Sequence, residues 1–440
     1  MTLRIIVFSF LSLALGAGLF TAATSAKNSL FAPARLDIII NIEDRSSGQA
    51  AKADVRKSAA SIVTQVQRAD YEGDRPALRR LYNDLAPFAD DKELGARVRY
   101  WRGFALWRRA LNGSNEKADP GELEQDLKQA VSEFEAAITK DPAFVDARAS
   151  AGATLGRLMF LYVRNPTIAG EFNDPARMRE SVNRAISYMN QAEAAEPENP
   201  RVLWVLGPLR YYLSLQRGEG PNKAIDAAIE LYQKGLKAAR ARKSAVRDPL
   251  IPSWGEPECL MSLAGANFYR TTPDVAAAEQ HAREALALVP YWHYVRDILT
   301  PQIETAKIKL EIIAMERAAL DRWGKGDPQG YLEIMAPDVT YFDPTREKRI
   351  DGLAAVKEYI IPITGKIRID NYEMINPQVQ RDGDVAILTF NLIDTVKRPD
   401  REEKVTVRWN STEVYRRIDG NWKIVHSHWS YTKPELNANK

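Results

Sequence analysis

Hydrophobic and polar positions follow a helical period over the first two thirds of the chain. From about residue 51 to residue 323, Ala, Leu, Glu, Arg and Lys dominate, and β-branched residues are sparse. These residue types favour helix, and apolar positions three or four residues apart predict amphipathic helices. The pattern therefore predicts an all-helical region over residues 51–300.

One spacing recurs within this region. Small or apolar residues at intervals of four and three, then a proline five residues later, occur at Ala130, Phe134, Ala137 and Pro142, at Ala185, Met189, Ala192 and Pro197, and at Ala278, Ala282, Ala285 and Pro290. Small residues let helices approach closely, and proline ends a helix. The spacing resembles the second helix of the tetratricopeptide repeat, which implies stacked helix pairs that bind a protein or peptide partner. A generic helical bundle is the alternative.

The pattern changes after a helix that starts at Thr300-Pro301, an N-cap followed by proline at the first helical position. We expect this helix to be shared by both parts of the chain. Beyond it, the sequence predicts helices over 328–335 and 353–361 and strands over 339–342, 368–379, 385–396, 405–416 and 422–431. Asp382-Gly383 and Asp419-Gly420 predict hairpins. Residues 301–433 therefore form, by prediction, an α+β cone whose curved antiparallel sheet encloses a cavity.

Four segments of this region resemble the nuclear transport factor 2-like superfold. They are Ala319-Leu-Asp-Arg-Trp-Gly-Lys-Gly-Asp327, Val339-Thr-Tyr-Phe-Asp-Pro344, Ile350-Asp-Gly352 and the run Glu413–Ser430. Over about 310–433 the chain is similar to the SnoaL-like branch and to the association (hub) domain of calcium/calmodulin-dependent kinase II. The resemblance implies a cone that dimerises through its outer sheet face. It leaves function open, because related pockets catalyse reactions, bind ligands or only assemble.

The resemblance also implies which residues line the pocket. Arginines of the basic hub pocket correspond here to Thr389, Glu413 and Trp429, and its histidine to Val356. Tyr331 matches a pocket tyrosine, and Trp409 falls on the same strand face as Glu413. A pocket without those basic groups suits a small uncharged or cationic ligand better than a simple carboxylate.

Glu413 and Asp343 are the candidate catalytic residues. Strand alternation places Glu413 on one face with Trp409 and Tyr415. A carboxylate in an apolar cavity has a raised pKa and suits a general base in isomerase-type chemistry. The alternative is that Glu413 pairs with Arg408, with Arg416 or with a partner chain.

His426 and His428 lie two residues apart, on the strand face opposite Ser427 and Trp429. With a third ligand they would form a zinc site, yet the C-terminal region contains no other histidine. The hub family has the same His-x-His without metal. We therefore expect structural histidines, with neither a metal nor a cofactor.

The N-terminus predicts export. Arg4 precedes an apolar run from Ile5 to Phe20, and small residues end at Ala26, which is typical of a cleaved signal peptide over residues 1–26. An uncleaved anchor is the alternative. We expect a flexible tether over 27–50, a tail over 434–440 and a periplasmic or secreted protein. The only cysteine, Cys259, excludes an intrachain disulfide.

The composition argues against one class of partner, nucleic acids. The formal charge of +3 in 440 residues gives no basis for nucleic-acid binding. The sequence favours an exported scaffold or binding protein, in which the helices recruit a protein and the SnoaL-like domain dimerises and holds a small ligand. A pocket enzyme with a carboxylate base and a purely architectural hub are the alternatives.

Overall fold

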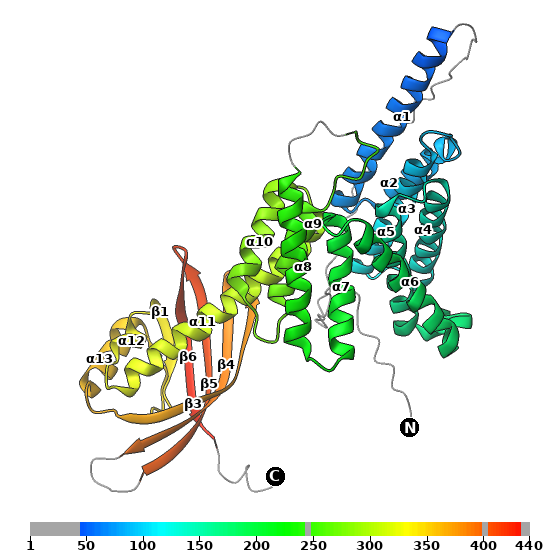
Figure 1. The fold of residues 1–440 in the computed structure, drawn as a ribbon. Coiled ribbons are helices and arrows are strands. Elements are labelled where there is room, and N and C mark those ends of the chain that lie inside the picture. The colour runs from blue at the N-terminus through cyan, green and yellow to red at the C-terminus, as the bar shows by residue number, and fades with distance from the viewer. Residues whose placement is uncertain (1–44, 243–247, 398–403, 433–440) are drawn as a thin grey trace. The chain divides into compact units, whose positions relative to one another are not determined.

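The computed structural model describes residues 45–242, 248–397 and 404–432, in two compact units, Met1–Pro301 and Gln302–Lys440 (Figure 1). The predicted signal peptide, tether residues 27–44 and the tail lie outside the described residues. Tether residues 45–50 are helical, since α1 begins at Arg45, which corrects the end of the predicted tether. Within the described ranges, no helix has the length and apolar character to cross a membrane.

The first unit is helical, as the sequence predicted. Its helices are α1 (Arg45–Glu72), α2 (Arg75–Asp84), α3 (Gly95–Asn115), α4 (Pro120–Lys140), α5 (Val145–Arg164), α6 (Pro175–Ala195), α7 (Pro200–Gln216), α8 (Pro221–Ala241), α9 (Glu256–Phe268) and α10 (Val275–Leu288). Side chains of Asp74, Asp119, Asp174, Asn199 and Asp274 cap five of them by accepting backbone N–H groups of the first turn.

Glycines let the paired helices of this unit approach closely. An added Cβ at Gly152 in α5 would lie 2.7 Å from Met189 Cγ and 2.8 Å from the Ala185 carbonyl in α6. At Gly207 in α7 it would overlap the Tyr232 ring of α8. The recurring residues of α4, α6 and α10 are buried at these contacts. This packing is compatible with tetratricopeptide-like repeats, which remain a prediction.

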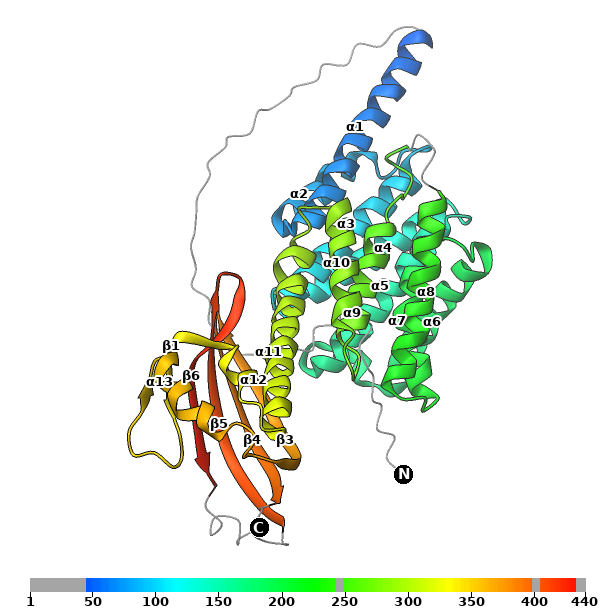
Figure 2. The ribbon, with the colours of Figure 1, turned by 90° about the vertical axis from the view of Figure 1, so that its left-hand side faces the viewer.

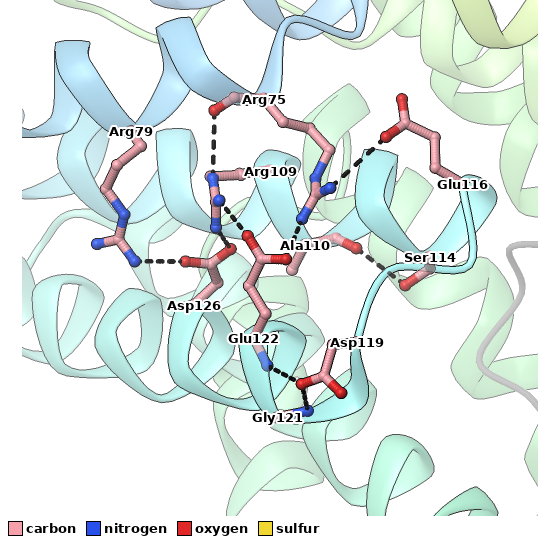
Figure 3. Close-up of polar contacts among 10 residues, drawn as sticks. All are labelled: Arg75, Arg79, Arg109, Ala110, Ser114, Glu116, Asp119, Gly121, Glu122 and Asp126. Atoms are coloured by element: carbon pink, nitrogen blue, oxygen red, sulfur yellow. Dashed lines mark hydrogen bonds and ion pairs between the residues drawn. The ribbon is translucent and has the colours of Figure 1, made fainter. Parts of the chain in front are cut away.

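An ion-pair network joins α2, α3 and α4 (Figure 3). Asp126 is fully buried and accepts from Arg79 Nη2 at 2.8 Å and from Arg109. Arg109 also reaches Glu122, which pairs with Arg75 Nη2 at 2.9 Å. Each carboxylate therefore has two guanidinium partners, which offsets the cost of burying its charge.

The second unit is a curved sheet with helices on one face (Figures 1 and 2). The helices are α11 (Thr300–Gly324, which starts two residues before the unit), α12 (Gln329–Leu332) and α13 (Leu353–Ile360). The strands are β1 (Met335–Phe342), β2 (Ile350–Asp351), β3 (Ile369–Asp382), β4 (Val385–Lys397), β5 (Lys404–Ile418) and β6 (Asn421–Tyr431). Their order is β2-β1-β6-β5-β4-β3, and β1 pairs with β6 in parallel, so the sheet is mixed rather than antiparallel throughout.

The start of α11 differs from the sequence prediction. A π-helical turn over Tyr294–Leu299 runs directly into α11, so Thr300 has helical dihedrals and is not an N-cap. Glu316 is fully buried, whereas the neighbouring Arg317 is exposed. The buried stripe therefore follows Ile312, Glu316 and Leu320, at intervals of four, and turns a carboxyl group into the cone.

Gly207→Ala tests the close packing of α7 against α8. The added methyl would overlap the Tyr232 ring, and we expect a loss of about 1–3 kcal/mol in the free energy of unfolding. Gly265→Ala is the matched control, because no atom lies within 4 Å of its Cβ position in α9. Helix propensity makes that change neutral or stabilising. Equal denaturant midpoints for the two variants would contradict the packing.

Candidate functional site

A cavity of about 210 Å³ lies inside the cone of the second unit. The residues that line it come from α11, α12, α13 and the inner faces of the strands. Most are apolar or aromatic; the aromatic ones are Trp323, Tyr331, Tyr341, Tyr359, Trp409, Trp429 and Tyr431. This combination of a preformed apolar hollow and a few polar groups is typical of small-ligand sites.

The ionisable side chains of this lining are acidic. Among the described residues, Asp343 and Asp394 are its only carboxylates, and no lysine, arginine or histidine is present. Asp394 is only 4% exposed. Its Oδ2 accepts from Trp409 Nε1 at 3.1 Å, whereas its Oδ1 has no hydrogen-bond partner among the described residues. Burial raises the pKa of Asp394, and the Trp409 and Val407 N–H groups offset part of that rise.

Asp343 is held more firmly at the cavity edge. Its Oδ2 accepts from the Tyr341 hydroxyl at 2.7 Å. Its Oδ1 accepts from the Thr345 backbone N–H at 2.8 Å and from the Thr345 hydroxyl at 2.5 Å. Because both oxygens already accept hydrogen bonds, Asp343 is less available to a ligand than Asp394.

Two glutamates form a sealed acidic pair behind the cavity wall, since Glu413 and Glu316 are both fully buried. Glu413 Oε1 accepts from Ser427 Oγ at 2.9 Å and from Ser411 Oγ at 3.3 Å, while Oε2 has no hydrogen-bond partner in the described part of the chain. Glu316 accepts from the hydroxyls of Tyr331 at 2.7 Å and Tyr415 at 2.6 Å.

Burial raises the pKa of both carboxyl groups. For Glu413 the neighbouring Glu316 raises the pKa further, to well above its ordinary value, and hydrogen bonds from Ser427 and Ser411 offset only part of this. These surroundings favour the neutral acid, because a second negative charge beside Glu316 would have neither water nor a cation to stabilise it. No ion pair joins Glu413 to an arginine among the described residues, and Arg416 pairs instead with Asp338 at 2.8 Å.

The structure brings four of the predicted site residues together. Tyr331, Trp409, Trp429 and Asp343 line the cavity. Glu413 lies on the inner face of β5 but does not line the cavity, because Ser427 lines it instead and donates to the carboxyl group. Ser427 therefore lies between the predicted base and any ligand bound in the cavity.

Two predicted pocket residues are corrected by the structure. Thr389 is exposed on the outer face of β4, since the inward positions are the even-numbered Leu388, Phe390 and Leu392. Val356 is fully buried in the core and does not line the cavity. Position-by-position transfer from a distant relative fails for Thr389 because a strand shifted by one residue presents its other face.

Sequence reasoning missed Asp394 and Glu316, and both left a signal. Asp394 follows Leu388, Phe390 and Leu392 in alternation on the inner face of β4. Glu316 lies four residues from both Ile312 and Leu320. In both cases a carboxylate occupies a position at which the periodicity of the element predicts a buried apolar residue. That pattern would have identified both residues.

The histidines lie on the outer face of the sheet. His426 Nδ1 is 2.8 Å from the Thr340 hydroxyl, and both histidine rings contact Phe342. Burial, His428 and Arg349 lower the pKa of His426. No group of three metal-binding side chains occurs within the described ranges.

The C-terminal unit is similar to a known family of domains. Residues 314–434 match the family described as SnoaL-like domain, which confirms the predicted resemblance of this region to SnoaL-like domains. The calcium/calmodulin-dependent protein kinase type II alpha chain of Drosophila melanogaster is 27% identical over 145 residues, which are 32% of this chain and 27% of the kinase. The chain thus spans about a quarter of that relative's length.

Solved structures match about a third of the chain. A putative ketosteroid isomerase from Parabacteroides distasonis has 37% identity and a TM-score of 0.25, and the match covers 32% of this chain and 92% of that one. The association domain of C. elegans CaMKII has 22% identity and a TM-score of 0.26, with 28% and 96% covered.

Glu413→Gln tests the sealed acidic pair. Because the pKa of Glu413 is higher in the folded than in the unfolded chain, its stabilising effect is complete below about pH 4.5. That effect is lost as pH rises toward the folded-state pKa, at up to about 1.4 kcal/mol per pH unit. We expect the variant, which cannot titrate there, to lose stability less steeply between pH 5 and pH 8 in calorimetric unfolding.

The control is Glu358→Gln, which neutralises an exposed glutamate on α13. It should keep the steep pH dependence of the wild-type protein. Identical slopes for wild type and Glu413→Gln would show that Glu413 ionises as easily in the folded chain as in the unfolded one.

Proposed function

We propose that the SnoaL-like domain is a binding module for a small uncharged or cationic ligand, and that the protein is a scaffold rather than an enzyme. The observation that carries this proposal is the cavity itself, which has an aromatic wall and acidic groups but no basic one among the described residues. Such a lining disfavours anionic ligands, because a buried anion beside Asp394 and Asp343 would be repelled.

The position of the carboxyl groups supports binding over catalysis. A general base must reach the proton that it abstracts, at about 2.6–3.2 Å or through one water. Glu413 has no exposed surface, and both oxygens of Asp343 already accept hydrogen bonds. With Glu413 as the base, the isomerase-type alternative would therefore require the cavity wall to open. With Asp343 as the base, it would require these hydrogen bonds to rearrange.

The outer face of the sheet supports association with a second copy of the chain. Exposed apolar side chains occur on this face at Phe342, Val385 and Ile387, whose exposed fractions are 41%, 39% and 37%. A sheet face that carries exposed apolar side chains gains free energy when another apolar surface covers it. We propose that this face forms the dimer interface of the domain.

The helical unit and the N-terminus complete the proposal. A cavity of about 110 Å³ in the helical unit has Trp107, Trp204 and Trp292 in its lining, together with Arg108 and Asn112. A cavity lined by aromatic rings can accept an apolar side chain of a partner, which supports recruitment of a protein or peptide there. The apolar run before Ala26 supports export and cleavage, so that this scaffold would act in the periplasm or outside the cell.

Leu392→Trp tests ligand binding. Leu392 lines the cavity from the inner face of β4, and a larger side chain there would fill it. With the neutral dye N-phenyl-1-naphthylamine as probe, we expect saturable energy transfer from tryptophan in the full-length protein and at least about tenfold weaker binding in the variant.

Thr389→Trp is the matched control, because it adds the same ring to the same strand on the exposed face. It should bind the dye like the wild-type protein. Absence of saturable binding to the wild type, or equal binding to both tryptophan variants, would contradict a ligand cavity in this domain.

Ile387→Lys tests association. A charge at the centre of an apolar interface must be desolvated, so we expect the dimer dissociation constant to rise at least about tenfold. Light scattering of the full-length chain at micromolar concentration measures this directly. Ile361→Lys is the control, since Ile361 is 46% exposed and lies outside the sheet. A monomeric wild-type protein would rule out dimerisation through this face at that concentration.

A further inference from the structure

Three aromatic rings and one carboxyl group gather on one side of the cavity, on β4, β5 and β6. The Trp409 ring lies 4.6 Å from Tyr431 at an interplanar angle of 34°, and 5.9 Å from Trp429 at 83°. Trp409 therefore has one ring tilted against it and one nearly perpendicular to it. All three rings line the cavity, as does Asp394, whose Oδ2 accepts the Trp409 N–H.

The buried carboxyl group lacks a counter-charge in this arrangement. Asp394 is only 4% exposed, and its Oδ1 has no hydrogen-bond partner among the described residues. Leaving a buried carboxylate oxygen without a partner is costly, and a positive charge within a few ångströms removes that cost. The described lining contains no basic side chain, so a cationic ligand would supply the missing counter-charge there.

The kind of cation follows from the scarcity of unpaired charged acceptors and from the aromatic wall. A primary ammonium group has three N–H donors and a guanidinium group five, and each needs an acceptor when it is buried. Asp394 Oδ1 is a carboxylate oxygen of the described lining without a partner, whereas both oxygens of Asp343 already accept hydrogen bonds. A tertiary ammonium has one donor and a quaternary ammonium none. Their alkyl groups suit an aromatic wall, and ring faces attract their charge.

We infer that the SnoaL-like domain binds a tertiary or quaternary ammonium compound, with the charged nitrogen close to both the face of the Trp409 ring and the Asp394 carboxylate. The inference rests on the proposed function, because it names the ligand class of the same cavity. It goes further in assigning Asp394 and Trp409 as the residues that select for charge. The remaining apolar lining, which includes Leu320, Ile360 and Leu392, would hold the uncharged part of the ligand.

Two probes that differ in charge but not in shape test this inference. Phenyltrimethylammonium and tert-butylbenzene have the same arrangement of heavy atoms, and only the first is charged. Titration of the full-length protein, followed by tryptophan fluorescence, should give a dissociation constant about tenfold lower for the cation. Because water solvates the cation better than the hydrocarbon, such a preference requires specific groups that stabilise the charge.

Asp394→Asn should remove the preference while leaving the binding of tert-butylbenzene nearly unchanged. Asp384→Asn, an exposed aspartate in the β3–β4 turn, is the matched control and should keep the preference. Trp409→Leu should weaken the binding of the cation more than that of the hydrocarbon. Thermal unfolding of each variant checks that the domain remains folded, and Asp394→Asn changes no side-chain volume.

The outcomes distinguish failure of the ammonium inference from failure of the proposed ligand-binding function. Equal binding of both probes by the wild-type protein would overturn the ammonium inference and leave the ligand cavity standing. An unchanged preference in Asp394→Asn would also overturn it, because Asp394 would then be a neutral acid with no role in selection. Saturable binding of neither probe, together with no binding of the neutral dye, would overturn the proposed function itself.

Discussion

Two hydrogen bonds to one buried carboxyl group set the geometry of the C-terminal domain. Glu316 of α11 accepts the hydroxyls of Tyr331 from α12 and Tyr415 from β5, at 2.7 and 2.6 Å. A helix that crosses a sheet can slide or roll on apolar contacts alone, whereas hydrogen bonds have defined lengths and directions. The cavity between α11 and the sheet therefore has a fixed width. Loss of either tyrosine hydroxyl would leave a buried oxygen unsatisfied.

The acidic groups of the domain lie at different distances from the cavity. Glu316 and Glu413 lie behind the cavity wall, where burial raises the pKa of each and favours the uncharged acid. Asp394 lies in the wall, with one oxygen bonded to Trp409 and the other without a hydrogen-bond partner in the described part of the chain. The inner pair thus serves the framework, and the outer carboxyl group is the one that a ligand can meet. The role of a glutamate on a pocket-facing strand, in the framework or in ligand binding, therefore depends on whether its side chain reaches the cavity.

The sequence predicted the order of elements well and the site only in part. Alternation and Asp-Gly turns located β3, β4, β5 and β6 to within a few residues, because both are local properties of a strand and its hairpin. The parallel pairing of β1 with β6 joins segments far apart in sequence, which no local pattern encodes.

The sequence also does not predict whether a particular side chain reaches the cavity. Thr389 was assigned to the pocket by alignment with a distant relative, and one strand position separates it from the inner face. Glu413 was placed on the correct face, yet whether it touches the cavity depends on Ser427 of the neighbouring strand. Such facts depend on tertiary packing, which strand propensity does not determine.

Strand β4 contributes to both surfaces of the domain on alternate residues. Leu392 and Asp394 face the cavity, while Val385, Ile387 and Thr389 face outward. Point substitutions can therefore alter ligand selectivity and subunit association independently, along the same few residues of chain. A single inserted or deleted residue would instead exchange the two faces and damage both at once. During divergence of such domains, this strand should accept many substitutions and very few changes of length.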